Sequence, residues 1–95
     1  MFDQKTIGVI GGIGPEATHD FFGKVLASTP VEKEQDHIRL LIENTPQVPD
    51  RNLSISGEGP SCAPALVAMA QNLERAGADI LVMPCNTAHA YASDI

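Results

Sequence analysis

A short apolar run that ends in glycines opens this chain and constrains its fold more than any other feature. Residues 6–10 read Thr-Ile-Gly-Val-Ile, residues 11–14 read Gly-Gly-Ile-Gly, and Pro15 follows. A continuous apolar run of this length is typical of a buried parallel strand, and proline suits the first turn of a helix. The pattern therefore predicts a strand over residues 6–10, a tight loop, and a helix over residues 15–28.

The same alternation of strand and helix continues along the chain. Residues 37–43 and 79–83 are rich in aliphatic side chains and are predicted strands. Residues 64–76 repeat apolar side chains at helical spacing, and Gly77 is the expected stop of that helix. Residues 44–60 form a long loop with several prolines, and loops of this length in compact domains are usually functional or mobile.

The order βαβαβ predicts an α/β fold in three layers, with a parallel sheet, right-handed crossovers and helices on both faces. A chain of 95 residues suffices for one domain, so residues 1–95 are interpreted as a single α/β lobe. Residues 90–95 begin a further helix, whereas a doubly wound domain normally continues with more strands. We therefore interpret the lobe as a partial, incomplete doubly wound unit of a longer design.

The charge balance of the chain disfavours two classes of binding partner. Twelve acidic and six basic residues give a net charge of −6, which disfavours binding to nucleic acid or to an anionic membrane surface. An anionic small molecule would need a local cation or a helix N-terminus at its site. No apolar run approaches the roughly 20 residues that span a bilayer, and the N-terminus lacks a signal-peptide layout. We expect a cytoplasmic location.

The first loop fits a known glycine pattern, because residues 12–17 read G-x-G-x-x-A between a predicted strand and a predicted helix. Glu43 closes the second predicted strand, where a dinucleotide-binding fold places an acid for the ribose. Backbone N–H groups at a helix N-terminus favour a phosphate and a carboxylate alike. Three interpretations stay open: a dinucleotide site, a loop in which Gly12, Ile13 and Gly14 bind an amino-acid carboxylate, and a tight turn without a ligand.

The two cysteines differ sharply in their surroundings. Cys85 follows the third predicted strand and precedes a predicted helix, so it lies at the carboxyl edge of the sheet, where ligands bind. The helix dipole there favours a reactive thiolate, although a small buried cysteine is the competing interpretation. Asn86 and Thr87 can cap the helix or bind a carboxylate, and His89 would share a helical face with the thiol. Cys62 has no apparent base or acceptor and is interpreted as structural, and two thiols without clustered histidines make a poor metal site.

Three segments of the chain, in order, resemble the aspartate/glutamate racemase family. Residues 6–18 are similar to its opening strand and loop, and residues 44–51 to its long substrate loop. Residues 83–89, which read Met-Pro-Cys-Asn-Thr-Ala-His, are similar to its first catalytic-cysteine motif. The resemblance implies an isomerase with two facing α/β lobes, each of which offers one cysteine. It also implies that no pyridoxal phosphate, metal or other cofactor takes part.

The resemblance further implies an acidic amino acid, aspartate or glutamate, as the ligand. Cys85 would be one of two acid/base groups, and Asn86 and Thr87 would bind the α-carboxylate or hold it near the thiol. Arg51 would pair with the side-chain carboxylate, because a planar guanidinium binds carboxylates with two hydrogen bonds. The chain carries the first cysteine motif and not the second, so we expect a second lobe or a homodimer partner to complete the site. The alternative is an inactive fragment, or a domain that binds a small anion or a dinucleotide.

Overall fold

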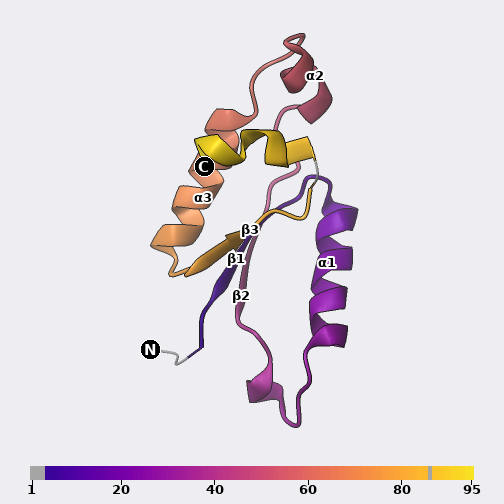
Figure 1. The fold of residues 1–95 in the computed structure, drawn as a ribbon, viewed down its shortest axis with the longest axis vertical. Helices are drawn as coiled ribbons and strands as arrows, with labels where there is room; N and C mark the ends of the chain where they lie inside the picture. Colours follow the sequence, from indigo (N-terminus) through magenta and orange to yellow (C-terminus); the bar gives the residue numbers. More distant parts are fainter. Residues whose placement is uncertain (1–3, 86) are drawn as a thin grey trace.

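The described part of the chain is a three-stranded parallel sheet with helices on both of its faces (Figure 1). The computed structural model describes residues 4–85 and 87–95. The elements are, in chain order, β1 (Ile7–Gly11), α1 (Pro15–Ser28), the 3₁₀ helix η1 (Glu34–Asp36), β2 (Leu40–Asn44), α2 (Arg51–Ser56), α3 (Ala63–Arg75), β3 (Ile80–Val82) and the 3₁₀ helix η2 (Thr87–Asp94). The predicted α/β class with a parallel sheet is confirmed.

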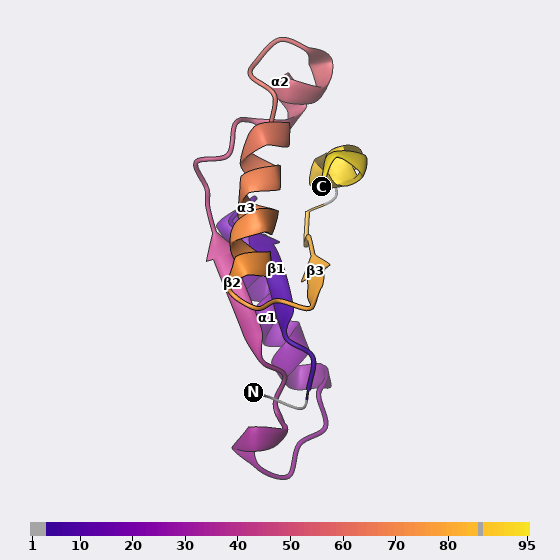
Figure 2. The ribbon, with the colours of Figure 1, turned by 90° about the vertical axis from the view of Figure 1, so that its left-hand side faces the viewer.

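β1 lies in the centre of the sheet, whose strand order is β2-β1-β3. Ile7 pairs with Leu40 on one side and with Ile80 on the other, and both pairings are parallel. α1 and α3 lie on opposite faces of the sheet, as the two views in Figures 1 and 2 show. Because all three strands run in the same direction, the segments that follow them emerge at one edge of the sheet. That edge carries the loop after β1, residues 45–50 and Cys85.

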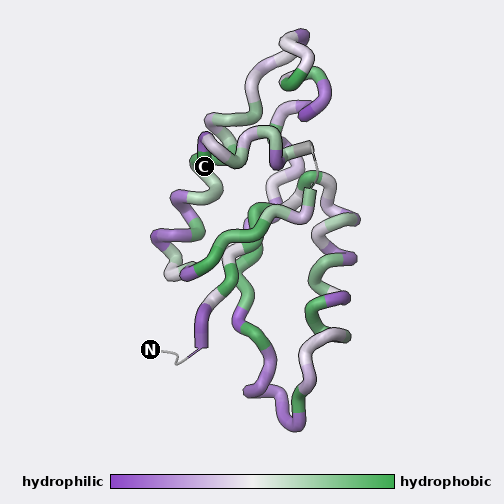
Figure 3. Tube along the Cα trace, viewed as in Figure 1, coloured by the Kyte–Doolittle hydropathy of each residue, from purple (hydrophilic) through white to green (hydrophobic). Residues whose placement is uncertain are grey.

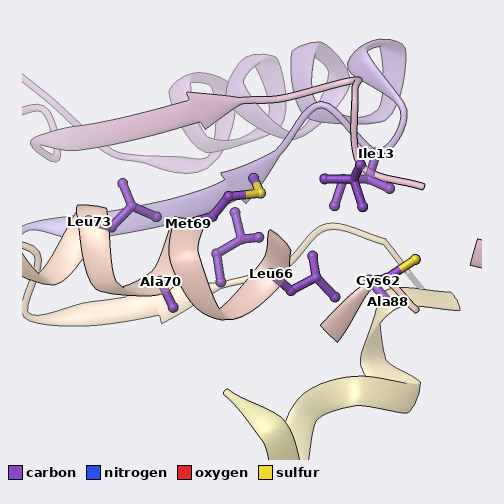
Figure 4. Packing of buried hydrophobic residues seen from close by; sticks show 9 residues of the cluster. Ile13, Cys62, Leu66, Met69, Ala70, Leu73 and Ala88 are labelled. Carbon is purple, nitrogen blue, oxygen red and sulfur yellow. The ribbon is translucent and has the colours of Figure 1, made fainter. Parts of the chain in front are cut away.

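The hydrophobic core lies between the sheet and α3. Leu66 and Leu73 on one face of α3 are almost fully buried, and α3 packs against β1 and β2. Figure 4 shows Met69 pointing from α3 toward the strands, with Ile13 and Ala88 at one end of the cluster. The buried cluster consists of Ile10, Ile13, Val48, Cys62, Leu66, Met69, Ala70, Leu73 and Ala88. The core therefore extends from α3 to the segments that follow the strands.

α1 covers the other face of the sheet loosely. Thr18 is buried, whereas Phe22 and Leu26 are 40% and 47% exposed. A hollow of about 250 Å³ lies between these two side chains and Leu40 and Ile42 of β2. Figure 3 shows hydrophilic and hydrophobic positions alternating along α1, while the strands are apolar over most of their length. The radius of gyration of 14.3 Å accordingly exceeds the about 12.4 Å expected for a compact domain of this size.

The long loop predicted over residues 44–60 contains the helix α2. Asp50 caps its start, because the side chain accepts a hydrogen bond from the Leu53 N–H at 3.0 Å. Gly57 ends it with a left-handed backbone at φ +82°. The expectation of a loop without secondary structure is therefore wrong at these residues, although both the cap and the stop are visible in the sequence.

Two other elements begin three residues away from the predicted start, whereas the other strands and α3 differ by a single residue at their ends. The second strand begins at Leu40 rather than at residue 37, because its partner strand begins at Ile7, which pairs with Leu40. The last helix is a 3₁₀ helix that begins at Thr87, whereas a helix was expected from residue 90. Among residues 4–85 and 87–95, no helix has the length and apolar character that crossing a bilayer demands.

Candidate active site

The three segments that resemble a racemase meet at the carboxyl edge of the sheet. Ile13 follows β1, Val48 follows β2 and Ala88 follows β3, and all three belong to one buried cluster. Cys85 is half-buried and packs against the same cluster. β2 and β3 flank β1 on opposite sides, so the order of the strands reverses beside β1. Open α/β sheets bind ligands at the carboxyl ends of the strands, next to such a reversal. The fold thus brings the predicted thiol and the predicted glycine loop to one edge of the sheet.

The glycine loop is held by contacts within the protein. The Gly12 N–H donates to the Thr18 hydroxyl oxygen at 2.8 Å, so this amide has an internal acceptor. Ile13 is 3% exposed and anchors the loop in the core. Gly14 is half-buried and is the N-cap residue of α1. Its backbone is extended, and no side chain caps the helix there. Of the three residues predicted to bind a carboxylate, Gly14 lies at the positive end of a helix, while Gly12 and Ile13 shape the loop.

Cys85 lies between the end of β3 and the start of η2. Its backbone N–H donates to the Met83 carbonyl at 2.8 Å, and the His89 Nε2 atom lies 2.8 Å from the same oxygen. The expectation that His89 and Cys85 share a helical face is wrong, because η2 is a 3₁₀ helix that begins at Thr87, after the thiol. His89 instead braces the carbonyl of the turn that carries Cys85. Asn86 and the side chain of Thr87 lie outside the described residues, so their role stays a prediction.

Arg51 is the first residue of α2, where Asp50 supplies the helix cap. The Arg51 Nε atom is buried and has no hydrogen-bond partner among residues 4–85 and 87–95. A buried donor without an acceptor costs about 1–3 kcal/mol, so an acceptor brought by a ligand would relieve that cost. A carboxylate is the acceptor that a guanidinium matches in both charge and shape. The position therefore suits a carboxylate ligand.

Ser54 and Tyr91 also belong to this edge, although no sequence pattern indicated them. The Ser54 hydroxyl forms a hydrogen bond with the Tyr91 hydroxyl and accepts the Cys62 N–H at 3.0 Å. The Cys62 thiol is fully buried and donates to the Pro49 carbonyl at 3.1 Å. The prediction that Cys62 lacks an acceptor is therefore wrong, whereas its burial agrees with a structural role. Ser54 and Tyr91 are 37 residues apart, so only the folded chain reveals their contact.

The described residues offer little support for a second amino-acid site, a dinucleotide site or a metal site. A hollow of about 530 Å³ lies along β3 and η2, with Phe21, Leu81 and Ile95 in a lining that holds no lysine or arginine. Such a lining does not suit an acidic amino acid. Glu43, the candidate ribose ligand, turns toward α3, where it accepts a hydrogen bond from Asn72 at 3.4 Å. Within the described residues, no group of three His, Cys, Asp or Glu side chains could bind a metal ion.

Comparison with known proteins decides the family. A sequence profile of the Asp/Glu/Hydantoin racemase family matches residues 10–95. The chain belongs to this family. It is similar to the broad specificity amino-acid racemase RacX of Bacillus subtilis (strain 168), with 31% identity over an alignment of 97 residues. The alignment covers 94% of this chain and 40% of the relative.

A solved structure supports the same assignment. The chain is similar to the aspartate racemase of Picrophilus torridus, with a TM-score of 0.91 and 37% sequence identity. The match covers 97% of this chain and 40% of that protein. The family resemblance inferred from the three motifs is thereby confirmed, and the chain spans 40% of the length of each of these two racemases.

Proposed function

We propose that this racemase-family chain supplies one half of an active site that inverts Cα of an acidic amino acid without a cofactor. Cys85 is one of the two acid/base groups of that site. One observation supports this function: Ile13, Val48 and Cys85 come from three separate motifs and pack in or against one buried cluster at the carboxyl edge of the sheet. The relatives, a broad specificity amino-acid racemase and an aspartate racemase, support the class of substrate.

The chemistry needs one group on each face of the substrate carbon. The Cys85 thiolate takes the Cα proton, and the electrons of the broken C–H bond pass into the α-carboxylate. A second acid returns a proton to the opposite face and so forms the inverted C–H bond. Cys62 does not fill that role, because it is fully buried and donates to the Pro49 carbonyl. The second acid therefore comes from a second lobe or from a second copy of this chain.

Charge explains how an anionic substrate binds to this acidic chain. Arg51 pairs with the side-chain carboxylate of aspartate or glutamate, since its buried Nε has no other partner in the described residues. Asn86 and Thr87 bind the α-carboxylate, and the N-terminus of α1 at Gly14 adds positive potential. The net charge of −6 disfavours nucleic acid and an anionic membrane surface as partners, and we expect the protein to act in the cytoplasm.

Deuterium exchange at Cα tests the role of the thiol. The chain is incubated in D₂O with each enantiomer of aspartate or glutamate, and loss of the Cα–H signal is followed by NMR. We expect exchange of one enantiomer without inversion, because a single thiol reaches only one face. Cys85→Ala should abolish the exchange, whereas Cys62→Ala, which alters the thiol outside the site, should retain it. Exchange that persists in a folded Cys85→Ala chain would remove this cysteine from the chemistry.

Dependence on protein concentration tests whether a second copy completes the site. A homodimer with one Cys85 on each side of the substrate would make racemisation rise with the square of the protein concentration. Mixing with Cys85→Ala chains should then suppress the rate, because a mixed dimer holds one thiol. No racemisation at any protein concentration would exclude the homodimer and leave a second lobe as the source of the second acid. A rate that is linear in concentration and insensitive to the variant chain would mean that one copy of the chain suffices, which would contradict the need for a second acid from outside it.

A further inference from the structure

A pair of hydroxyl groups joins the helix that begins with Arg51 to the helix that follows Cys85. Ser54 of α2 and Tyr91 of η2 form this hydrogen bond across 37 residues of sequence. The Ser54 hydroxyl also accepts the Cys62 N–H at 3.0 Å, which ties it to the start of α3. Tyr91 is half-buried and packs against the core cluster. One hydroxyl of α2 is therefore anchored to two other elements.

The remainder of α2 is weakly held. Leu53 and Ile55 are 45% and 52% exposed, and a helix of six residues is not stable by itself. α2 packs against η2, so the bond between Ser54 and Tyr91 is a polar contact within that interface. Arg51 lies three residues before Ser54, and residues at this spacing are neighbours on one face of a helix. The placement of Ser54 thus determines the placement of Arg51.

We propose that Ser54 and Tyr91 are a positioning pair that holds Arg51 in register with Cys85 and so sets the affinity for the side-chain carboxylate of the substrate. This role rests on the proposed function, in which Arg51 binds that carboxylate and Cys85 reaches Cα. Neither hydroxyl needs to touch the substrate. When the bond is lost, α2 moves more freely against η2, and Arg51 occupies its binding position for a smaller fraction of the time.

The test compares Tyr91→Phe, which removes one hydroxyl, with Ser56→Ala. The Ser56 hydroxyl donates to the Leu53 carbonyl within α2, so this control removes a hydroxyl from the same helix without touching η2. Hydrogen–deuterium exchange of residues 51–57 measures the anchoring of α2 without a ligand. The rate of Cys85 alkylation by iodoacetamide, measured at rising L-aspartate and in parallel at rising L-glutamate, gives the half-protecting concentration of each amino acid.

We expect Tyr91→Phe to speed the exchange of residues 51–57. We also expect it to raise the half-protecting concentration about 3-fold to 10-fold, which is the effect of losing one hydrogen bond. The rate of alkylation without amino acid should not change. Ser56→Ala should leave both readouts unchanged, and Ser54→Thr, which keeps a hydroxyl, should do the same. Ser54→Ala should have at least the effect of Tyr91→Phe, because it also removes the acceptor of the Cys62 N–H.

Each contrary result has its own meaning. Unchanged exchange of residues 51–57 in Tyr91→Phe would overturn the anchoring of α2. Faster exchange with an unchanged half-protecting concentration would overturn the positioning role and leave the proposed function standing. If neither amino acid protects Cys85 in the unsubstituted chain, the proposed function fails and the positioning role fails with it.

Discussion

Gly12 lies so close to Thr45 that a Cβ atom at position 12 would stand 2.3 Å from the Thr45 backbone nitrogen. The Gly12 backbone has a φ of +87°, and the Thr45 N–H donates to the adjacent Gly11 carbonyl at 3.0 Å. The loop after β1 and the loop after β2 are therefore in direct backbone contact, with no side chain between them. This contact joins the glycine loop to the segment that leads to Arg51.

Gly12→Ala should lower the free energy of unfolding by about 3 kcal/mol or more, because left-handed strain adds to a clash with backbone atoms. Gly57→Ala is the matched control, since Gly57 has a φ of +82° and nothing within 4 Å of its added Cβ. It should cost only about 1–2 kcal/mol, the strain alone. Urea denaturation of the two variants measures the difference. Equal losses would show that the approach to Thr45 is not tight.

Thr18→Val should destabilise the chain by about 1–3 kcal/mol, because the change preserves shape and leaves the buried Gly12 N–H without its acceptor. The Thr18 hydroxyl oxygen accepts that N–H at 2.8 Å. Thr18→Ser keeps the hydroxyl and should restore most of the loss. Thermal unfolding followed by circular dichroism gives the comparison, and a valine variant as stable as the serine variant would contradict the importance of this bond.

Cys85 should react with limiting iodoacetamide more than about tenfold faster than Cys62, because a buried thiol reacts only after local opening. Cys62 is fully buried and its thiol donates a hydrogen bond to the Pro49 carbonyl, whereas Cys85 is half-buried at the carboxyl edge of the sheet. Mass spectrometry of the partly labelled protein identifies the modified residue. The same reaction in urea is the control, in which both thiols should label at similar rates. Equal labelling of the folded chain would count against the assignment of Cys85.

The chain should self-associate through the outer edge of β3, because an unpaired strand with apolar side chains recruits other strands. In the described residues β3 pairs with β1 alone, and Ile80 on β3 is 47% exposed. Ile80→Lys should shift the protein toward monomer in sedimentation velocity. Leu26→Lys on α1 is the control, because Leu26 is exposed to the same 47% and lies away from this edge.

If both lysine variants weaken association equally, apolar surface in general drives it. A chain that stays monomeric and unfolds sharply and reversibly at high temperature would contradict the predicted self-association.

Long periodic elements could be predicted from the sequence, and contacts between distant residues could not. The strands and the helices α1 and α3 follow from apolar runs and helical spacing. α2 was missed because six residues show less than two helical turns, and its stability depends on packing against η2. The prediction that His89 and Cys85 share a helical face is wrong because it assumes the spacing of an α-helix. The segment that contains His89 is a 3₁₀ helix, and Cys85 precedes it.

The candidate site divides in the same way. The motif around Cys85 is contiguous in sequence, so its place after a strand could be predicted. The acceptor of the Cys62 thiol, the Pro49 carbonyl, comes from 13 residues earlier in a segment without regular structure, and no local rule connects the two. The hydrogen bond between Ser54 and Tyr91 depends on the position of η2. That position follows from the pairing of β3 with β1, so it is set only once the sheet has assembled.

The central place of β1 has a consequence for synthesis on the ribosome. Just before β1, the Thr6 N–H donates to the Asp79 carboxylate, 73 residues later in the chain, at 2.8 Å. Translation at about 5–20 residues per second delivers that partner roughly 4–15 s after β1 has been made. Once β1 has emerged from the ribosome, one of its edges stays unpaired until β3 emerges, and until then it is open to chaperones or to neighbouring nascent chains. Cys85 is translated after β3, so the thiol reaches its place only when the oldest strand of the sheet has acquired its last neighbour.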